Sequence, residues 1–292
     1  MGTRAAALKV SLDNVLYTTD FHQRSRAALP YALSIARKYG SKVYVAHVIA
    51  LSPFPNAAPT GAWRAIEAQA IRESKEAAIE LSPFFGGITN EVLIRKGDIW
   101  KEISEIVEEK RIDLIVTGTH GRSGVGKMIM GSVAEKIFRQ APCPVLTIGP
   151  SIHGEPDRFA DLHSILVPTD FTPESLAAVS YATSLAQMNQ ARLYLLYVAP
   201  ADEVPEASLK EALRNLIPPE TDLSFAPKVF VEAGVPSQTI LDLSEELAVD
   251  LIVLGVKRPE IFQGTSTHQT MATTGKVVNG ATCPVITVRP ND

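Results

Sequence analysis

Cysteine is scarce in this sequence: its 292 residues include two, Cys143 and Cys283. Two cysteines so far apart cannot form the disulfide framework of a small secreted protein or a zinc cluster. They indicate a reducing compartment, so the cytoplasm is the expected location. Long apolar runs are also lacking, since none approaches the roughly 18 residues that a membrane helix needs. The N-terminal MGTRAAALKVSLDN lacks the apolar middle of a secretion signal, and we expect a soluble, unexported protein.

An excess of positive charge is lacking too. Lys and Arg number 28 against 32 Asp and Glu, which gives a formal net charge of -4. No basic field favours nucleic acid or an anionic membrane surface, so neither is expected as a partner. Hydrophobic residues (46%) and charged residues (21%) occur in ordinary globular proportions. This composition excludes a mainly disordered or low-complexity chain.

The chain contains an internal repeat. Residues 12–50 align without a gap to residues 162–200, with 14 identities in 39 positions. Three later matches continue the correspondence: Gly97 with Gly234, DLIVTG at 113–118 with DLIVLG at 250–255, and CPVLT at 143–147 with CPVIT at 283–287. Two tandem copies also fit the length, since one domain takes roughly 150 residues.

The repeat predicts two domains, residues 1–150 and 160–292. The stretch between the copies, residues 150–161, is polar and carries Pro and Gly, as a linker does. Two similar units suggest an internal pseudo-dimer, in which VLTI at 145–148 and VITV at 285–288 pair as edge strands. Association of whole chains into a homodimer stays open.

Each copy alternates apolar runs of strand length with segments of helical periodicity, which predicts parallel strands joined by crossover helices. The strands expected in the first copy are 15–19, 43–49, 91–95, 113–118 and 145–148. The helices expected there are a face from Ala27 to Ala36 that ends at Gly40, then 62–82, 98–110 and 132–140. The predicted fold class is therefore α/β: two tandem units, each a five-stranded parallel, Rossmann-like sheet with helices on both faces.

The strand at 113–118 is followed by a loop rich in glycine, GTHGRSGVGKMIMGS. Glycine lets backbone amides approach a ligand, and consecutive amides form an anion-binding concavity. Gly131 and Ser132 then open a helix, so free amides and the positive end of the helix dipole point at the same place. Open α/β sheets bind ligands at the carboxyl ends of their strands. The loop therefore predicts a phosphate site.

Two other interpretations compete for this loop. Gly121, Gly126 and Lys127 fit G-x-x-x-x-G-K, the core of the nucleoside triphosphatase phosphate loop. Met128 breaks that match, because a thioether is a poor ligand for the magnesium that a Ser or Thr hydroxyl would bind there. The other interpretation is a plain surface loop whose glycines serve only turns. Five glycines joined to a Ser-led helix after a buried strand favour the phosphate site.

The glycine spacing also carries a family resemblance. Gly118 is followed after two residues by Gly121, and after nine more by Gly131 and Ser132. With Asp20 closing the first strand and APCPVLTI leading into the last, this pattern resembles the adenine-nucleotide motif of the universal stress protein family. The resemblance covers both units. It implies an adenine nucleotide alpha hydrolase-like fold, ATP binding, dimerisation through the last strand and a role in stress response.

By that resemblance, residues of the first unit would hold ATP. Thr18, Thr19 and Asp20 would border the nucleoside, and Val48 would meet the adenine through its backbone. The remaining residues would approach the ribose and phosphates (Gly118, Thr119, Gly121 and Arg122) or hold the phosphate tail (Gly131, Ser132 and Val133). Thr18 departs from the family pattern, because the second unit has the more familiar residue, Pro168, at that position.

The second unit keeps only part of the pattern. Asp170 and Gly255 remain, but three positions differ and now hold Arg258, Met271 and Ala272. Losing two charge-assisted hydrogen bonds would weaken phosphate binding by about a hundred- to ten-thousand-fold. We expect poor nucleotide binding or none in this unit. The counter-hypothesis is that side chains rebuild an anion site there, from Lys257, Arg258, Thr273 and Thr274.

Several candidates have a simpler structural explanation. Asp20 and Asp170 each precede an amphipathic helix that they would cap, and we expect the nucleotide role at Asp20 and capping at Asp170. His120 has no partner carboxylate or nucleophile in the sequence, so backbone positioning is expected. The histidines lack the paired spacing of a metal site. No structural metal is predicted, with magnesium left open as a companion of ATP. The cysteines are expected to behave as small hydrophobes.

The leading hypothesis is an ATP-binding stress-response protein that senses or sequesters adenine nucleotide, with no catalytic residue required. One alternative is an enzyme that slowly hydrolyses ATP or transfers its phosphate, using Asp20 with magnesium. The other is a protein-interaction platform whose nucleotide pocket is vestigial.

Overall fold

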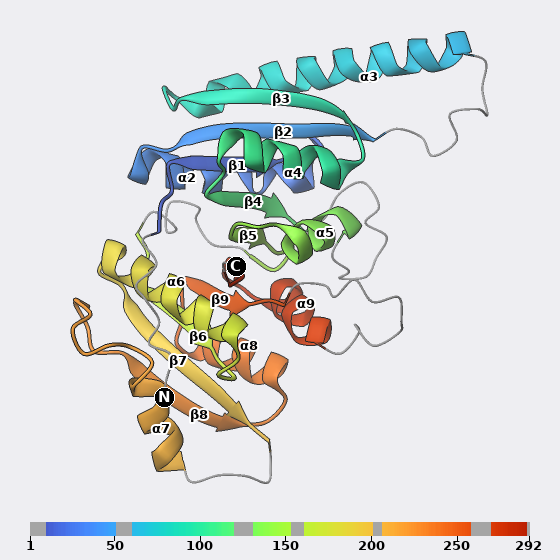
Figure 1. Ribbon diagram of the computed structural model, residues 1–292. Coiled ribbons are helices and arrows are strands. Elements are labelled where there is room, and N and C mark those ends of the chain that lie inside the picture. Colours follow the sequence, from blue (N-terminus) through green and yellow to red (C-terminus); the bar gives the residue numbers. More distant parts are fainter. Residues whose placement is uncertain are drawn as a thin grey trace.

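The two repeats build one continuous sheet (Figure 1). The computed structural model describes residues 10–50, 60–119, 131–152, 161–200, 206–257 and 270–290. Within these residues the strand order is β3-β2-β1-β4-β5-β10-β9-β6-β7-β8, so each repeat contributes five neighbouring strands. The paired strands are parallel within each half, and β5 and β10 are antiparallel where the halves meet. The fold class predicted from the sequence is confirmed.

The first half alternates strands and helices as its periodicity predicts. Its strands are β1 (Asn14–Thr18), β2 (Lys42–Ala50), β3 (Asn90–Gly97), β4 (Leu114–Gly118) and β5 (Val145–Ile148). Its helices are α1 (Gln23–Arg26), α2 (Leu29–Tyr39), α3 (Thr60–Leu81), the short 3-10 helix η1 (Ser82–Phe85), α4 (Ile99–Lys110) and α5 (Ser132–Gln140).

The second half repeats this order with a shorter middle. Its strands are β6 (Ser164–Pro168), β7 (Arg192–Ala199), β8 (Lys228–Ala233), β9 (Leu251–Gly255) and β10 (Val285–Val288). Its helices are α6 (Pro173–Asn189), α7 (Glu206–Arg214), α8 (Pro236–Glu246) and α9 (Thr270–Gly280).

The first helical segment differs between the halves. The second half has the unbroken α6, whereas the first half has α1 and then α2, with Pro30 in the first turn of α2. Proline has no N–H, and its ring clashes with the carbonyl four residues earlier in a helix, here that of Arg26. The helix is therefore interrupted after Arg26. Gly40 ends α2 in the left-handed conformation, with φ of 72°, as the sequence predicts.

Helices cover both faces of the sheet (Figure 1). One core lies under α2, α6 and the ends of α3 and α7, and the other lies under α4, α5, α8 and α9. Side chains of the two central strands alternate between the cores: Leu146 and Ile286 enter the first, and Val145 and Val285 enter the second. Each core therefore runs across the junction of the halves without a break.

The halves are joined by the pairing of β5 with β10. Leu146 lies opposite Ile286, and on either side of them Val145 lies opposite Thr287 and Thr147 opposite Val285. Positions that correspond in the repeat thus face each other around Leu146 and Ile286, which is the geometry of a two-fold interface. The pairing predicted for VLTI and VITV is present, and it removes the open edge that each strand would otherwise have.

Two tyrosines near this junction differ in their hydrogen bonding. The hydroxyl of Tyr39, at the end of α2, donates to Oδ1 of Asn189, at the end of α6, over 2.7 Å. The hydroxyl of Tyr181 in α6 is buried and has no hydrogen-bond partner among the described residues. Burial raises the pKa of both phenols above the usual value.

The two hydroxyls should therefore respond differently to removal. Tyr39→Phe breaks a bond between the halves, and we expect it to lower the free energy of unfolding by about 1 kcal/mol. Tyr181→Phe removes a hydroxyl that is buried without a described partner, so the free energy of unfolding should stay unchanged or rise by up to about 1 kcal/mol. Urea unfolding of both variants measures the difference. Equal losses would contradict this assignment of partners.

Gly255 is in close contact with the first turn of α6. A Cβ at this position would lie 2.3 Å from the carbonyl carbon of Glu174 and 2.5 Å from the nitrogen of Ser175. Backbone atoms cannot yield such space unless α6 moves, so Gly255→Ala should destabilise the protein by about 3 kcal/mol or more.

The matched control is Gly275→Ala in α9, where an added Cβ meets nothing within 4 Å. Alanine is the better helix former, so this variant should gain about 0.5–1 kcal/mol. Denaturant unfolding compares the two variants. A Gly255→Ala protein as stable as its parent would show that α6 does not pack on β9 in this way.

Candidate functional site

The strand order reverses between β1 and β4. From β1 the chain builds outward to β2 and β3, whereas β4 leads to β5 on the other side. Such a reversal opens a crevice at the carboxyl ends of the strands, where ligands bind in open α/β sheets. Here the two strand ends are tied together, because the hydroxyl of Thr18 donates to that of Thr117 over 2.9 Å.

The loop after β1 is held by its own side chains. The buried hydroxyl of Thr19 accepts a hydrogen bond from the N–H of Phe21 (2.9 Å) and pairs with the hydroxyl of Ser25 (3.0 Å). Oδ1 of Asp20 accepts from the N–H of His22 over 3.0 Å. Thr18 and Thr19 thus point into the protein. Asp20 is half-buried, and it uses one of its two carboxylate oxygens, Oδ1, for the hydrogen bond to His22.

An aromatic pair supports this loop from β2. The ring of His47 packs on that of Phe21 with 4.7 Å between centroids, and its Nδ1 lies 2.9 Å from the carbonyl oxygen of Thr19. Phe21 has a φ of 63°, which costs strain in a residue other than glycine. Phe171 and Tyr197 form the same contact in the second half, at 5.5 Å. Sequence reasoning missed this pair, although the repeat aligns its members.

The described residues on either side of the glycine-rich loop meet at Thr119. The N–H of Thr119 donates to the carbonyl of Ile148 (3.1 Å), and the N–H of Gly131 donates to the carbonyl of Thr119 (2.6 Å). Gly118 and Thr119 therefore lie beside the start of α5. The predicted ligands Gly121 and Arg122 lie outside the described residues, as does His120.

Gly131 is the N-cap of α5, and no side chain caps this helix. The first hydrogen bond of the helix runs from the N–H of Glu135 to the carbonyl of Gly131, over 3.0 Å. The amides of Ser132 and Val133 precede it, so they belong to the group that a helix leaves without an internal partner. Together with the helix dipole they suit an anion.

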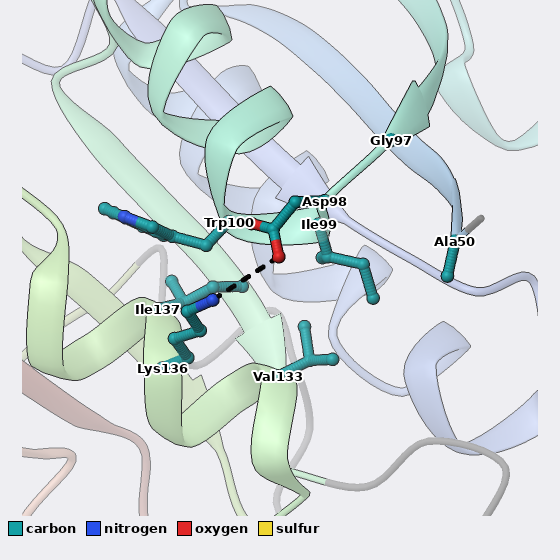
Figure 2. A pocket seen from close by; sticks show the side chains of 8 residues that line it. All are labelled: Ala50, Gly97, Asp98, Ile99, Trp100, Val133, Lys136 and Ile137. Atoms are coloured by element: carbon teal, nitrogen blue, oxygen red, sulfur yellow. Dashed lines mark ion pairs between the residues drawn. The ribbon is translucent and has the colours of Figure 1, made fainter. Parts of the chain in front are cut away.

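A pocket of about 240 Å³ opens beside this helix end (Figure 2). It lies between the carboxyl ends of β2 and β3 and the first turns of α4 and α5, and Lys136 and Asp98 form an ion pair of 3.6 Å in it. The lining residues are mostly apolar: Ala50, Gly97, Asp98, Ile99, Trp100, Val133, Lys136 and Ile137. This volume is below the roughly 300–1,000 Å³ of a complete small-molecule site, so the pocket has room for part of a ligand, and its apolar lining with a few polar groups is typical of such sites.

Of the predicted ligands that the structure describes, Val133 is the one in the lining of this pocket. Val48 lies on β2, two residues before the lining residue Ala50, and packs against the second core. Sequence reasoning did not identify the lining residues at the start of α4, which are Asp98, Ile99 and Trp100. Gly97 gave a signal, because it matches Gly234 in the repeat. Both have φ near 150°, and a Cβ at Gly97 would lie 2.7 Å from Oε1 of Glu102.

The structure corrects the role expected for Asp170. The N-cap of α6 is Thr172, whose hydroxyl accepts from the N–H of Ser175. Asp170 acts one step earlier, since its Oδ1 accepts from the N–H of Thr172 over 3.1 Å and also pairs with that hydroxyl. Asp170 therefore orients Thr172, the residue that caps α6. The N-cap lies two residues after Asp170, where the sequence had suggested it.

Across the described ranges, no three His, Cys, Asp or Glu side chains gather closely enough to bind a metal ion. No helix within the same part of the chain combines the length and the apolar character needed to span a membrane.

The continuous sheet of two similar five-stranded parallel halves, with helices on both faces, defines a tandem α/β protein with two Rossmann-like halves. The profile of the universal stress protein family matches residues 11–149 and again residues 162–289. The chain therefore belongs to the universal stress protein family, as its glycine pattern indicated.

Known relatives agree with this assignment. A universal stress protein of Mycolicibacterium smegmatis is 24% identical over 299 residues, covering 94% of this chain and 97% of its own length. One of Methanocaldococcus jannaschii is 32% identical over 136 residues, covering 46% of this chain and 80% of its own. The crystal structure of a universal stress protein of Archaeoglobus fulgidus has a TM-score of 0.75 at 22% identity and covers 96% of this chain and 97% of its own. That likeness shows the fold.

The two cysteines lie away from the pocket, just before β5 and β10. Both are free thiols, with Cys283 buried and Cys143 partly buried. Burial raises the pKa of each thiol to about 12. Since the thiolate is the reactive form, both are poor nucleophiles in the folded protein.

Alkylation tests this assignment. At pH 8 the thiolate fraction of either cysteine should be roughly a thousandfold below that of an ordinary thiol. We expect iodoacetamide to leave both unmodified in the native protein and to label both in urea, as followed by intact mass. Rapid labelling of the native protein at either position would contradict a purely structural role.

Proposed function

We propose that the first half binds ATP and that the protein acts as a nucleotide-dependent sensor or regulator in the stress response. One observation carries the proposal: an apolar pocket opens beside the uncapped N-terminus of α5, at the carboxyl edge of a parallel sheet. The apolar lining suits a nucleoside, and the helix end suits its phosphates. Family membership supports the general stress role.

In this proposal the predicted ligands divide into two groups. Thr18 and Thr19 act through position, because their hydroxyls hold the loop that carries Asp20. Direct contacts would come from Asp20, the backbone of Val48, the Gly118–Thr119 segment and the helix start, with Gly121 and Arg122 completing the phosphate site. Magnesium would accompany the triphosphate, since Mg²⁺ is usually held by substrate phosphates and few carboxylates.

The proposal assigns one nucleotide to each chain. Met271 and Ala272 replace Gly131 and Ser132 in the second half, so we assign that half a structural role. No catalytic step is included. We also place the protein in the cytoplasm, where a reducing environment keeps its two free thiols as they are.

Calorimetric titration with ATP tests the site. The parent protein should bind about one ATP per chain. Val133→Glu puts a carboxylate in the pocket beside the proposed phosphates, and we expect the affinity to fall at least tenfold, or about 1.4 kcal/mol. The helix itself should tolerate the change, because an acidic residue in the first turn is favourable.

Thr273→Glu is the matched control, because Thr273 holds the position of Val133 in the second half. It should leave the affinity and the stoichiometry as they are. An unchanged affinity in Val133→Glu would reject the site, and two equivalent ATP molecules per chain would reject the assignment of the second half.

A further inference from the structure

Lys136 and Asp98 supply the charge among the eight described residues that line the pocket. Figure 2 shows them facing each other, Lys136 from α5 and Asp98 from the start of α4. Lys136 stands three residues after Val133, so it shares the helix face that borders the pocket. Helical side chains lean toward the N-terminus of their helix. The ammonium group is thereby directed toward the helix end that we propose as the phosphate site.

The two oxygens of Asp98 have separate partners. Oδ1 accepts the N-cap hydrogen bond from the N–H of Lys101 over 2.9 Å. Oδ2 lies 3.6 Å from Nζ of Lys136. The hydrogen bond from Lys101 and then the charge of Lys136 hold the pKa of Asp98 below its ordinary value. Asp98 is therefore a carboxylate at neutral pH, so that the pair is ionic.

This ion pair is open to exchange. The side chains of Lys136 and Asp98 are 45% and 61% exposed, and an exposed pair of this kind contributes little to stability. A phosphate group carries more charge than a carboxylate and forms shorter, stronger hydrogen bonds with an ammonium group. A phosphate tail at the start of α5 would therefore take Lys136 from Asp98.

We infer that Lys136 is a phosphate-binding residue of the nucleotide site and that Asp98 competes with the phosphates for its ammonium group. The inference rests on the proposed function and adds to it a residue pair that tunes affinity by phosphate charge. The second half has the lysine without the carboxylate, because Lys276 holds the position of Lys136 and Val235 that of Asp98.

Titration of the full chain with ATP and with adenosine tests the pair. Lys136→Met keeps the apolar stem that lines the pocket and removes the charge. We expect it to weaken ATP binding about three- to tenfold and to leave adenosine binding unchanged. Asp98→Asn preserves the N-cap, since asparagine caps helices well, and should tighten ATP binding about two- to threefold. Lys276→Met, the matched control, should bind ATP as the parent does.

The outcomes separate this inference from the function on which it rests. Equal losses for ATP and adenosine in Lys136→Met would show a packing role, and unchanged ATP binding would show no role; either result overturns the inference and leaves the proposed site standing. Weaker ATP binding in Asp98→Asn would overturn the competition. A parent protein that binds neither ligand would overturn both proposals. Added salt should narrow the difference between parent and Lys136→Met, because screening weakens exposed charges. Unfolding midpoints confirm that the variants are folded.

Discussion

The antiparallel pairing of β5 with β10 is the constraint on which the rest of the structure depends. Each half ends in a four-residue strand, and in an isolated half that strand would expose an apolar open edge. Pairing covers both edges and lets each core continue from one half to the other. The contact reaches the site as well. Arg289, just after β10, donates from Nη2 to the carbonyl of Phe138 over 3.3 Å, and Phe138 lies on α5, whose first turn borders the pocket. The second half thus supports a helix of the first.

Much of this architecture follows from periodicity in the sequence. A strand buried on both faces, such as β4, must be apolar almost throughout, and Leu114, Ile115 and Val116 are buried as DLIVTG predicts. Strand bounds in the first half lie within two residues of those expected, and β5 and α5 have the expected bounds, although periodicity marks a face more sharply than an end. The interruption after Arg26 was missed, since the apolar spacing runs on through Ala27 and Ala28 while Pro30 removes the hydrogen bond that would join the helices.

The candidate site was harder to predict, because a pocket depends on which elements meet. The glycine pattern located the start of α5. The first amides of any helix lack a partner within the helix, so this part of the site follows from the sequence alone. The opposite wall comes from β3 and α4, and no local signal says that Ile99 and Trp100 face Val133 across a gap. Gly97 shows the difficulty well. The repeat matched it to Gly234, but only the structure shows that it ends β3 directly before Asp98, the N-cap of α4, which meets Lys136. That pairing exists only in the folded protein.

The pairing of β5 with β10 also explains how the halves differ in their loops while sharing a fold. The junction uses backbone hydrogen bonds of β5 and β10 and side chains buried on either side of them, and none of these groups belongs to the ligand edge. Tethering two halves in one chain also supplies each last strand with its partner at a high effective concentration. The pairing therefore places no demand on the residues after β9, so Arg258, Met271 and Ala272 can stand where the first half has glycines and serine without cost to the sheet. In the proposed function, binding therefore depends on the backbone amides and the pocket of the first half, whereas the second half contributes the strand that completes the sheet.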